Sequence, residues 1–318
     1  MAGMVEGKTS CRVQGQLFYL TATPHRRSPV QLLLTQRPGY TAKANMANGF
    51  SPLAIPTPVE TTAKFTLPLD ILLPLLLFPT IFLAHHIRKD YHAYLALGPG
   101  GAPSTPAGYL KICILRPFAV RNPLAPPSLP STLLPQEGYL KSRNLPDRFG
   151  PRPQVVGIVP HRQMTQKASA EMYAALTKEM QSLVNAHPSV LYTGTSCFEK
   201  HSTGIFCRLG PGALTRQEQE QQRKRLTCNG EVCHAHQFDG SLHLTLHPAD
   251  IRLVLEKGWG QRHPIAREDW WWLRRSVPSG FVMIYAPRNE EERRCVVEII
   301  RAAAWWVRGE ALPEYSPE

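Results

Sequence analysis

The chain has 318 residues and a formal net charge of +12 at pH 7, from 36 Lys and Arg against 24 Asp and Glu. This length allows one large domain or two small ones. No helix-turn-helix, RNA-binding or zinc-finger spacing accompanies the basic excess, so we expect no nucleic-acid partner. Much of the excess lies in the first third of the chain, which fits an anionic membrane surface or a targeting role better.

Residues 1–63 show no sustained helical or strand periodicity. Their only acidic residues are Glu6 and Glu60, whereas Lys, Arg, Pro, Ser and Thr recur. This composition predicts a disordered leader. An organellar presequence is the alternative, because such segments are rich in Arg and Ser and poor in acids.

Residues 65–87 are predicted to form one transmembrane helix. The stretch from Ile71 to Ala84 carries no charge, and Asp70 is the only formal charge of the segment. Its length suffices to cross roughly 30 Å of hydrocarbon. Pro74 and Pro79 would break a soluble core helix, but membrane helices tolerate proline better. A buried core segment is the alternative. We expect a single-pass membrane protein, in the endoplasmic reticulum in preference to the mitochondrion, with its orientation left open.

Residues 88–152 are rich in Pro and Gly. We expect a connector that wraps over the following domain and does not form a domain of its own. Its apolar run at 108–115 fits either a strand or a short helix.

Residues 153–310 predict an α+β domain in which helices cover a mixed sheet, followed by a tail at 311–318. We expect strands at 154–159, 196–200, 203–209, 242–246 and 281–286, and a charged connection at 215–225. A helix at 169–186 follows from its apolar spacing. Pro248 suits the first turn of a second helix that closes at Gly258. Asn289 and Glu292 predict a capping box for a last helix, which ends at Gly309.

Histidines are concentrated in one short stretch of this domain, at His234, His236, His243, His247 and His263. Imidazole moves protons near neutral pH and is the commonest metal ligand, so the cluster predicts a functional site. His234 and His236 have i, i+2 spacing, which on a strand places both rings on one face.

Two designs fit this cluster. In the first, His234, His236 and His243 bind iron or zinc, with Glu231 or Asp239 as a fourth ligand; Cys228 and Cys233 also stand close enough in sequence for a zinc site. In the second, which we favour, no metal is bound and no cofactor beyond O2 is needed: one histidine is a general base and the others orient the substrate or stabilise an oxyanion. A purely structural role is expected for His247, which precedes Pro248.

The catalytic candidates are therefore His234, His236, His243 and His263. The substrate-binding candidates are Arg262, Trp259, Arg288, Asp239 and Tyr285. Trp259 either stacks on a flat substrate or fills the core, and Arg288 either binds an anionic oxygen or pairs with Glu290 to Glu292. The loop from Trp270 to Trp272 is expected to touch lipid headgroups or line a pocket mouth.

Several runs resemble the fungal luciferase family. They are Ile87-Arg-Lys-Asp-Tyr-His-Ala-Tyr-Leu-Ala-Leu-Gly-Pro99, Gly108-Tyr-Leu-Lys-Ile-Cys-Ile-Leu115, His234-Ala-His236, Ser241-Leu-His-Leu244, Lys257-Gly-Trp-Gly-Gln-Arg-His-Pro-Ile-Ala266 and Tyr285-Ala-Pro-Arg-Asn-Glu-Glu-Glu292. The resemblance spans roughly residues 80–309. Two features depart from the light emitters: a longer leader, and the Trp270–Arg275 loop in place of a shorter Gly/Pro-rich connection.

The resemblance implies a membrane-anchored oxygenase, whose light-emitting relatives add O2 to the enolic pyrone 3-hydroxyhispidin. An ionised enol can react with O2 without a redox cofactor if the protein removes the proton, holds the enolate and excludes water. His236 or His243 would be the base, and Arg262, His263 and Arg288 would hold the anion. A different pyrone or phenol of secondary metabolism is an equally good substrate. The rival function is a non-catalytic, membrane-anchored binding or metal-holding module. We expect a small-molecule substrate and a membrane as partners, with no obligate protein partner.

Overall fold

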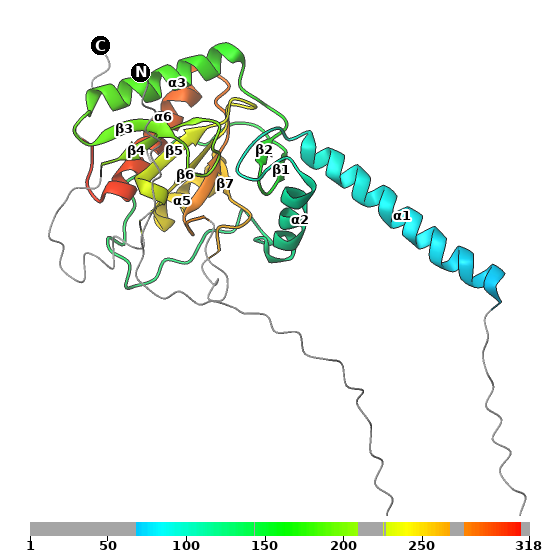
Figure 1. Cartoon of the computed structure of the whole chain (residues 1–318). Coiled ribbons are helices and arrows are strands. Elements are labelled where there is room, and N and C mark those ends of the chain that lie inside the picture. Colours follow the sequence, from blue (N-terminus) through cyan, green and yellow to red (C-terminus); the bar gives the residue numbers. More distant parts are fainter. Residues whose placement is uncertain (1–67, 143, 209–224, 226, 268–276, 313–318) are drawn as a thin grey trace, which may run out of the picture. The chain divides into compact units, whose positions relative to one another are not determined.

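A six-stranded antiparallel sheet forms the centre of the folded part of the chain (Figure 1). The computed structural model describes residues 68–142, 144–208, 225, 227–267 and 277–312. The strand order is β3-β4-β5-β6-β8-β7. The strands are β3 (Leu191–Thr195), β4 (Thr203–Cys207), β5 (Glu231–Ala235), β6 (Leu242–Thr245), β7 (Gly260–Arg262) and β8 (Phe281–Ile284). The leader at 1–63, nearly all of the connection at 215–225 and the tryptophan loop lie outside the described residues.

The α+β class is confirmed, but the prediction of a mixed sheet is wrong for the described strands, because every pairing among them is antiparallel. Short connections, such as residues 236–241 between β5 and β6, return the chain beside the strand it has just left. The strand predicted at 196–200 is instead the turn between β3 and β4. Lys200 has φ +68° there, a left-handed conformation that a strand does not contain.

One face of the sheet packs against helices. Leu242 and Leu244 of β6 lie beside Ile284 and Val282 of β8, and all four side chains are fully buried. The helix α6 (Glu290–Arg308) covers β5 and β6, and α3 (Ala170–Ala186) packs on β3 and α6. This apolar face forms the main core of the molecule.

Side-chain caps mark the starts of α3 and α6. Ser169 Oγ accepts from Met172 N at the start of α3, and Asn289 accepts from Glu292 N at the start of α6. The capping box predicted for Asn289 and Glu292 is half formed, because the Glu292 carboxylate accepts from Arg288 N instead of Asn289 N. The helix α5 (Pro248–Glu256) begins at the predicted proline, but it ends at Glu256 and not at Gly258 as predicted. Gly309 ends α6 at φ +95°, a conformation for which glycine carries no Cβ penalty.

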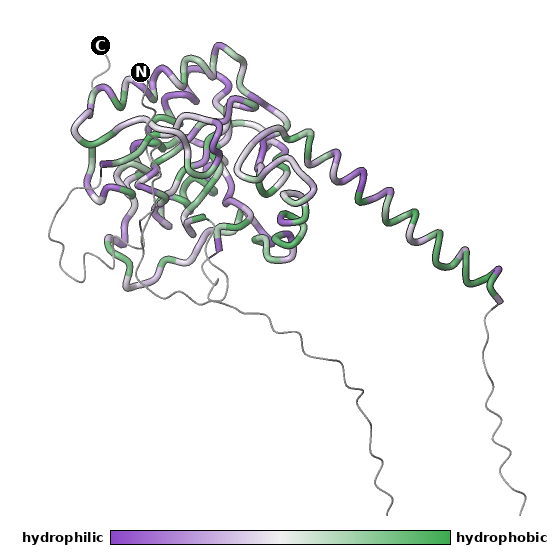
Figure 2. The backbone as a smooth tube through the Cα atoms, viewed as in Figure 1, coloured by the Kyte–Doolittle hydropathy of each residue, from purple (hydrophilic) through white to green (hydrophobic). Residues whose placement is uncertain are grey.

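The predicted membrane segment is helical but extends further than expected. The helix α1 runs from Leu69 to Leu95, because Arg88 to Leu95 continue it instead of ending it. Its length and hydropathy suffice to cross a membrane, and its apolar side chains are exposed. Figure 2 shows hydrophobic residues following one another along its first part. Both Pro74 and Pro79 lie inside the helix.

The run at 108–115 proves to be helical. It belongs to α2 (Pro106–Leu115), which is capped by Thr105 and followed by the 3-10 turn Arg116–Phe118. Arg116 pairs with Asp90 of α1 at 2.6 Å, and the Tyr109 hydroxyl donates to the same carboxylate at 2.8 Å. Both α2 and the residue that follows it are therefore held against the last part of α1.

The remaining segment before the sheet contacts the core at several points. Leu140 and Leu145 are buried in the main core, and Asp250 of α5 accepts from the backbone N–H groups of Tyr139 and Leu140. A hairpin then follows, made of β1 (Val155–Gly157) and β2 (His161–Gln163). Ile158 of this hairpin packs with Ile112 and Leu115 of α2 in a second, smaller core.

Candidate functional site

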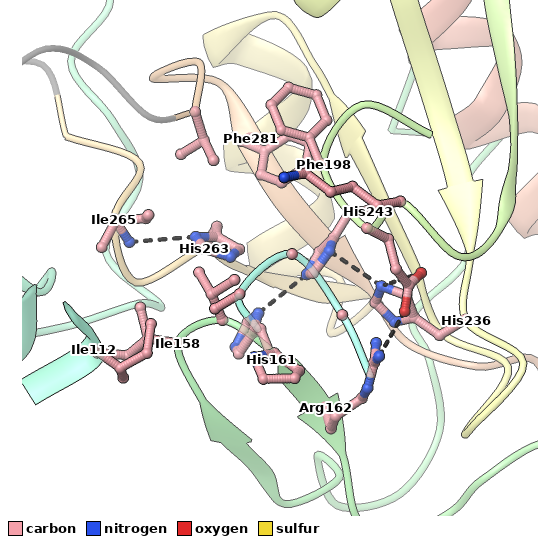
Figure 3. A pocket seen from close by; sticks show the side chains of 18 of the residues that line it. Ile112, Ile158, His161, Arg162, Phe198, His236, His243, His263, Ile265 and Phe281 are labelled. Atoms are coloured by element: carbon pink, nitrogen blue, oxygen red, sulfur yellow. Dashed lines mark hydrogen bonds and ion pairs between the residues drawn. The ribbon is translucent and has the colours of Figure 1, made fainter. Parts of the chain in front are cut away.

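The histidines gather on the sheet face opposite the helices. His234 of β5 and His243 of β6 are direct cross-strand partners, and His236 follows β5. The ring centroids are 5.3 Å apart for His234 and His236, and 4.5 Å apart for His236 and His243. All three side chains are buried. The predicted placement of His234 and His236 on one face is thus confirmed, and Figure 3 shows His236 and His243 side by side.

Carboxylates hold the outer ring nitrogens of His234 and His236. Nδ1 of His234 lies 2.7 Å from Glu231 Oε1, which also accepts from the Ser196 hydroxyl at 2.7 Å. Nδ1 of His236 lies 2.9 Å from Ser241 Oγ, and that hydroxyl donates to Asp239 at 2.6 Å. Since carboxylates accept, these contacts fix the ring protons on Nδ1 and leave both Nε2 lone pairs directed inward.

Two more histidines extend the cluster. His161 of β2 places Nδ1 3.1 Å from His243 Nε2, while His243 Nδ1 lies 3.2 Å from His236 Nε2. His263 follows β7, and its ring centroid lies 5.0 Å from that of His161. Its Nδ1 accepts from Ile265 N at 3.3 Å. Five imidazoles therefore share one buried site, drawn from two sheet strands and from segments on either side of them.

One ion pair forms the charged wall of the site. Arg162 of β2 donates to Glu199 Oε1 at 2.5 Å, and both side chains are buried. The other carboxylate oxygen, Oε2, lies 3.9 Å from His234 Nε2 and 3.7 Å from His236 Nε2, and it accepts from Ser202 Oγ at 2.9 Å. Glu199 thus faces the inward nitrogens of both histidines.

These groups line a pocket of about 180 Å³. Apolar side chains line it as well, namely Ile112 and Leu115 of α2, Ile158, Phe198, Ile265 and Phe281 (Figure 3). The Phe281 ring packs against the rings of His243 and His263, with centroids 5.1 and 5.4 Å apart. Lys111 and Lys200 also line the pocket. A small molecule with a flat apolar part and an acidic polar end fits this lining.

Burial sets the charge state of the histidines. It lowers the pKa of His161 and His243 well below the ordinary value, and neighbouring imidazoles lower each further. Burial likewise lowers the pKa of His263 to about 3. For Asp239, burial alone would raise the pKa, but hydrogen bonds from His236 and Ser241 outweigh it and lower the pKa. The site therefore holds neutral imidazoles beside ionised carboxylates near pH 7.

Four predicted substrate-binding residues lie elsewhere. Trp259 is buried in the main core and donates Nε1–H to Pro146 O at 2.7 Å, so it fills the core as the alternative held. Tyr285 is buried with its hydroxyl 3.1 Å from Gln261 Oε1. Arg262 donates to Ala266 O at 2.8 Å and lines a separate surface hollow. Arg288 pairs with Glu292, which confirms the ion-pair alternative.

Asp239 and His247 have supporting positions. Asp239 accepts from Gln163 N and Ser241 N at 2.8 Å each, so it orients β2 and Ser241 and does not line the pocket wall. His247 accepts from Ala249 N and contacts Pro135 O at 2.9 Å, and the structural role predicted for it is confirmed. Glu231 and Asp239, predicted as a fourth metal ligand, instead contact the outer nitrogens of the histidines.

His161, Arg162 and Glu199 were not among the predicted site residues. His161 and Arg162 form a lone His-Arg pair in a three-residue strand, and Glu199 lies in a turn mistaken for a strand. None stands at a recognisable spacing from the histidine cluster. The one available signal was a basic pair directly after Val159-Pro160, which resembles the Arg262-His263-Pro264 run in composition.

Comparison with known proteins places the cluster in a described family. The luciferase domain matches residues 229–303, which carry His234, His236, His243 and His263. The chain is 32% identical to a luciferase of Neonothopanus nambi over 68% of this chain and 79% of that one. It is 33% identical to a luciferase of Armillaria mellea over 69% of this chain and 80% of that one. No solved structure matches. The chain therefore belongs to the fungal luciferase family and is an oxidoreductase of the luciferase-like oxygenase class.

Proposed function

We propose that the protein is a membrane-anchored oxygenase that adds O2 to an enolic or phenolic small molecule, such as a hydroxypyrone or another polyketide of secondary metabolism. The observation that supports it best is the pocket lining, in which buried imidazoles and the Glu199 carboxylate stand beside apolar side chains. An acidic enol at the polar end would leave its ring against Phe198 and Phe281.

The histidines provide the base. His236 holds its Nδ1 proton against Ser241 and Asp239, so Nε2 is the nitrogen that takes the substrate proton. His243 is the alternative base, since its Nδ1 lies 3.2 Å from His236 Nε2 and therefore reaches the same part of the pocket. Neutral imidazoles are ready to accept a proton near pH 7, and a buried site excludes the water that would compete with O2 for the enolate. His234 and His263 complete the catalytic set in this proposal.

The proposal also assigns a role to each segment of the chain. Residues 1–63 form a leader, 65–87 span the membrane of the endoplasmic reticulum, 88–152 connect, 153–310 carry the reaction and 311–318 form a tail. Support comes from the apolar length of α1 and from α2, which joins the end of α1 to the pocket wall through Ile112 and Leu115. A poorly soluble substrate would thus reach a pocket beside the membrane.

The test is O2 uptake by the purified full-length protein with a panel of hydroxypyrones and phenols. Uptake with at least one compound is expected, and loss of uptake in His236→Ala assigns it to this pocket. His187→Ala is the matched control, because it removes a buried imidazole at the end of α3, outside the cluster. No uptake from folded protein with any compound would overturn the proposal.

The second candidate function is a non-catalytic, membrane-anchored module that holds a metal or a ligand. Three histidines with converging ring nitrogens favour it. Such a module would bind its ligand without consuming O2 or changing the ligand, so product analysis by mass spectrometry separates the two functions.

A further inference from the structure

We propose that His234, His236, His243 and Glu199 bind one divalent transition-metal ion. The site lies in the pocket of the proposed oxygenase, and the binding of an ion does not depend on any substrate. An ion on His236 Nε2 would occupy the lone pair proposed above as the base, so with a metal bound the ion would instead acidify the enol as a Lewis acid. The four side chains come from β5, the residue after it, β6 and the turn between β3 and β4. The ligand atoms of the three histidines lie within 4.8 Å of one another.

Acceptor atoms of His234, His236 and Glu199 face one another. The Nδ1 protons of His234 and His236 are directed at Glu231 and Ser241, so their Nε2 atoms present lone pairs. Both lone pairs face Glu199 Oε2, at 3.9 and 3.7 Å. Ser202 Oγ donates to Oε2 at 2.9 Å, and His243 Nδ1 lies 3.2 Å from His236 Nε2. A cation bound among these acceptors would offset the repulsion between them.

The distances are compatible with one ion. Two ligands about 2.1 Å from one ion lie about 3.0 Å apart at right angles and about 3.4 Å apart at a tetrahedral angle. His236 Nε2 and His243 Nδ1 are 3.2 Å apart, whereas the contacts of Glu199 Oε2 with His234 and His236 are wider, at 3.9 and 3.7 Å. The Glu199 side chain would therefore move inward to join the three histidines on an ion.

The buried charges of the site do not balance. Glu199, Glu231 and Asp239 are three buried carboxylates in or against the cluster, and the buried cation that contacts it among the described residues is Arg162. Two negative charges are left over in a low-dielectric site. A divalent cation balances them.

The groups behind the ligands also fit a metal site. Histidines that bind metals usually donate their other N–H to a carboxylate or a hydroxyl, which orients the ring. His234 has Glu231 and Ser196 in this position, and His236 has Ser241 and Asp239. Nε2 of His243 faces His161 at 3.1 Å, and Arg162 occupies the second oxygen of Glu199. Each of the four ligands thus has a partner behind it.

A second triad, His161, His243 and His263, also has nitrogens within reach of one another, but it fits a metal less well. His263 Nδ1 already accepts from Ile265 N, and no carboxylate faces that triad among its described hydrogen bonds and ion pairs. We therefore place the ion beside Glu199.

Three imidazoles and one carboxylate suit first-row ions such as Fe²⁺, Mn²⁺, Co²⁺ and Zn²⁺. Such an ion, when bound, would supply a Lewis acid for an enolate oxygen and, for a redox-active metal, a partner for O2.

The test is elemental analysis of the purified full-length protein, followed by removal of metal with a chelator and titration with Co²⁺, whose visible absorption reports its ligands. One ion per chain and a saturable Co²⁺ spectrum are expected. His234→Ala and Glu199→Gln should abolish the stoichiometric binding, and Glu231→Gln should weaken it by about 10- to 100-fold. His263→Ala and His187→Ala should leave it unchanged. Circular dichroism checks that each variant is folded.

Several results would overturn the inference: no stoichiometric metal and no Co²⁺ spectrum in folded wild-type protein, unchanged binding in both His234→Ala and Glu199→Gln, or binding lost only in His263→Ala, which would move the ion to the second triad. Glu199→Gln nearly preserves the shape of the side chain, so a folding failure in His234→Ala does not block the test. If a metal binds but no hydroxypyrone consumes O2, the metal site stands and the proposed oxygenase fails.

Discussion

The two faces of the central sheet are built from alternating residues of the same strands, but one face packs the core and the other forms the candidate site. On one face, Leu242 and Leu244 of β6 pack against α6. On the other face, His243, which lies between them in sequence, contacts His236 and His161. Each face is buried, yet one is apolar and the other carries polar groups. Burial alone therefore does not distinguish a core from a site. The buried groups of the site are polar and need hydrogen-bonding partners, whereas those of the core are apolar and need none.

The comparison predicts that variants on the two faces fail in different ways. A substitution on the histidine face should abolish O2 uptake without lowering the free energy of unfolding, because the helices pack on the other side. A substitution on the apolar face should lower the free energy of unfolding without changing the O2 uptake of the molecules that remain folded.

The largest effect is expected for His236→Ala. Loss of a general base typically lowers the rate by about 10²- to 10⁴-fold, so O2 uptake should fall by that factor. Cooperative urea unfolding should persist, because Leu242, Leu244 and α6 are untouched. Steady-state O2 uptake and urea titration measure the two properties on one sample. A variant that keeps its activity would remove His236 from the mechanism.

Leu244→Ala should show the converse. Its side chain is fully buried, and truncating a core leucine costs about 2 to 5 kcal/mol of unfolding free energy. O2 uptake per folded molecule should stay near the wild-type value at low temperature. Urea unfolding followed by tryptophan fluorescence gives the loss in stability. An equal loss of activity in protein shown to be folded would mean that the two faces are coupled.

The helices and strands could be predicted from the sequence better than the site on the histidine face. Ser169, Pro248, Asn289 and Gly309 end or begin helices through their nearest neighbours, so local sequence identifies them. The alternation that separates Leu242 from His243 is also local. The antiparallel order was not predicted, because it depends on how each connection returns the chain.

The charged half of the site could not be predicted for a related reason. Glu199 meets His234 across a strand pairing between β4 and β5, and Arg162 arrives from a hairpin far back in the chain. Neither has a spacing relative to the histidines that the sequence constrains. Conversely, Trp259, Tyr285 and Arg288 lie in short runs that resemble the family, yet Trp259 and Tyr285 are buried away from the pocket and Arg288 pairs with Glu292 of α6. Shared motifs thus mark the residues that support a site as readily as those that line it.

A buried carboxylate on the helix side sharpens the comparison further. Burial raises the pKa of Asp250 to about 6, whereas Asp239, held by His236 and Ser241, has a lowered pKa. Because the folded state holds the Asp250 proton more tightly, its contribution to stability is present below pH 3.8 and is lost as the pH rises to about 6. Asp250→Asn should therefore gain about 2 kcal/mol relative to wild type between pH 4 and pH 7. Urea titrations across this range measure the difference, and parallel curves for the two proteins would contradict it.

The smallest effect is expected at Asn289, the N-cap of α6, which packs on the apolar face. Asn289 accepts from Glu292 N at 2.9 Å, and losing such a cap costs about 1 kcal/mol. Asn289→Ala should therefore lower the unfolding free energy by that amount, while Asn289→Asp, which keeps an accepting oxygen, should stay close to wild type. Both variants should leave O2 uptake unchanged, because no described residue of α6 lines the pocket. A reduction of O2 uptake in Asn289→Ala that Asn289→Asp restores would show that the position of α6 controls the geometry of the site, and the two faces would then have to be treated as one unit.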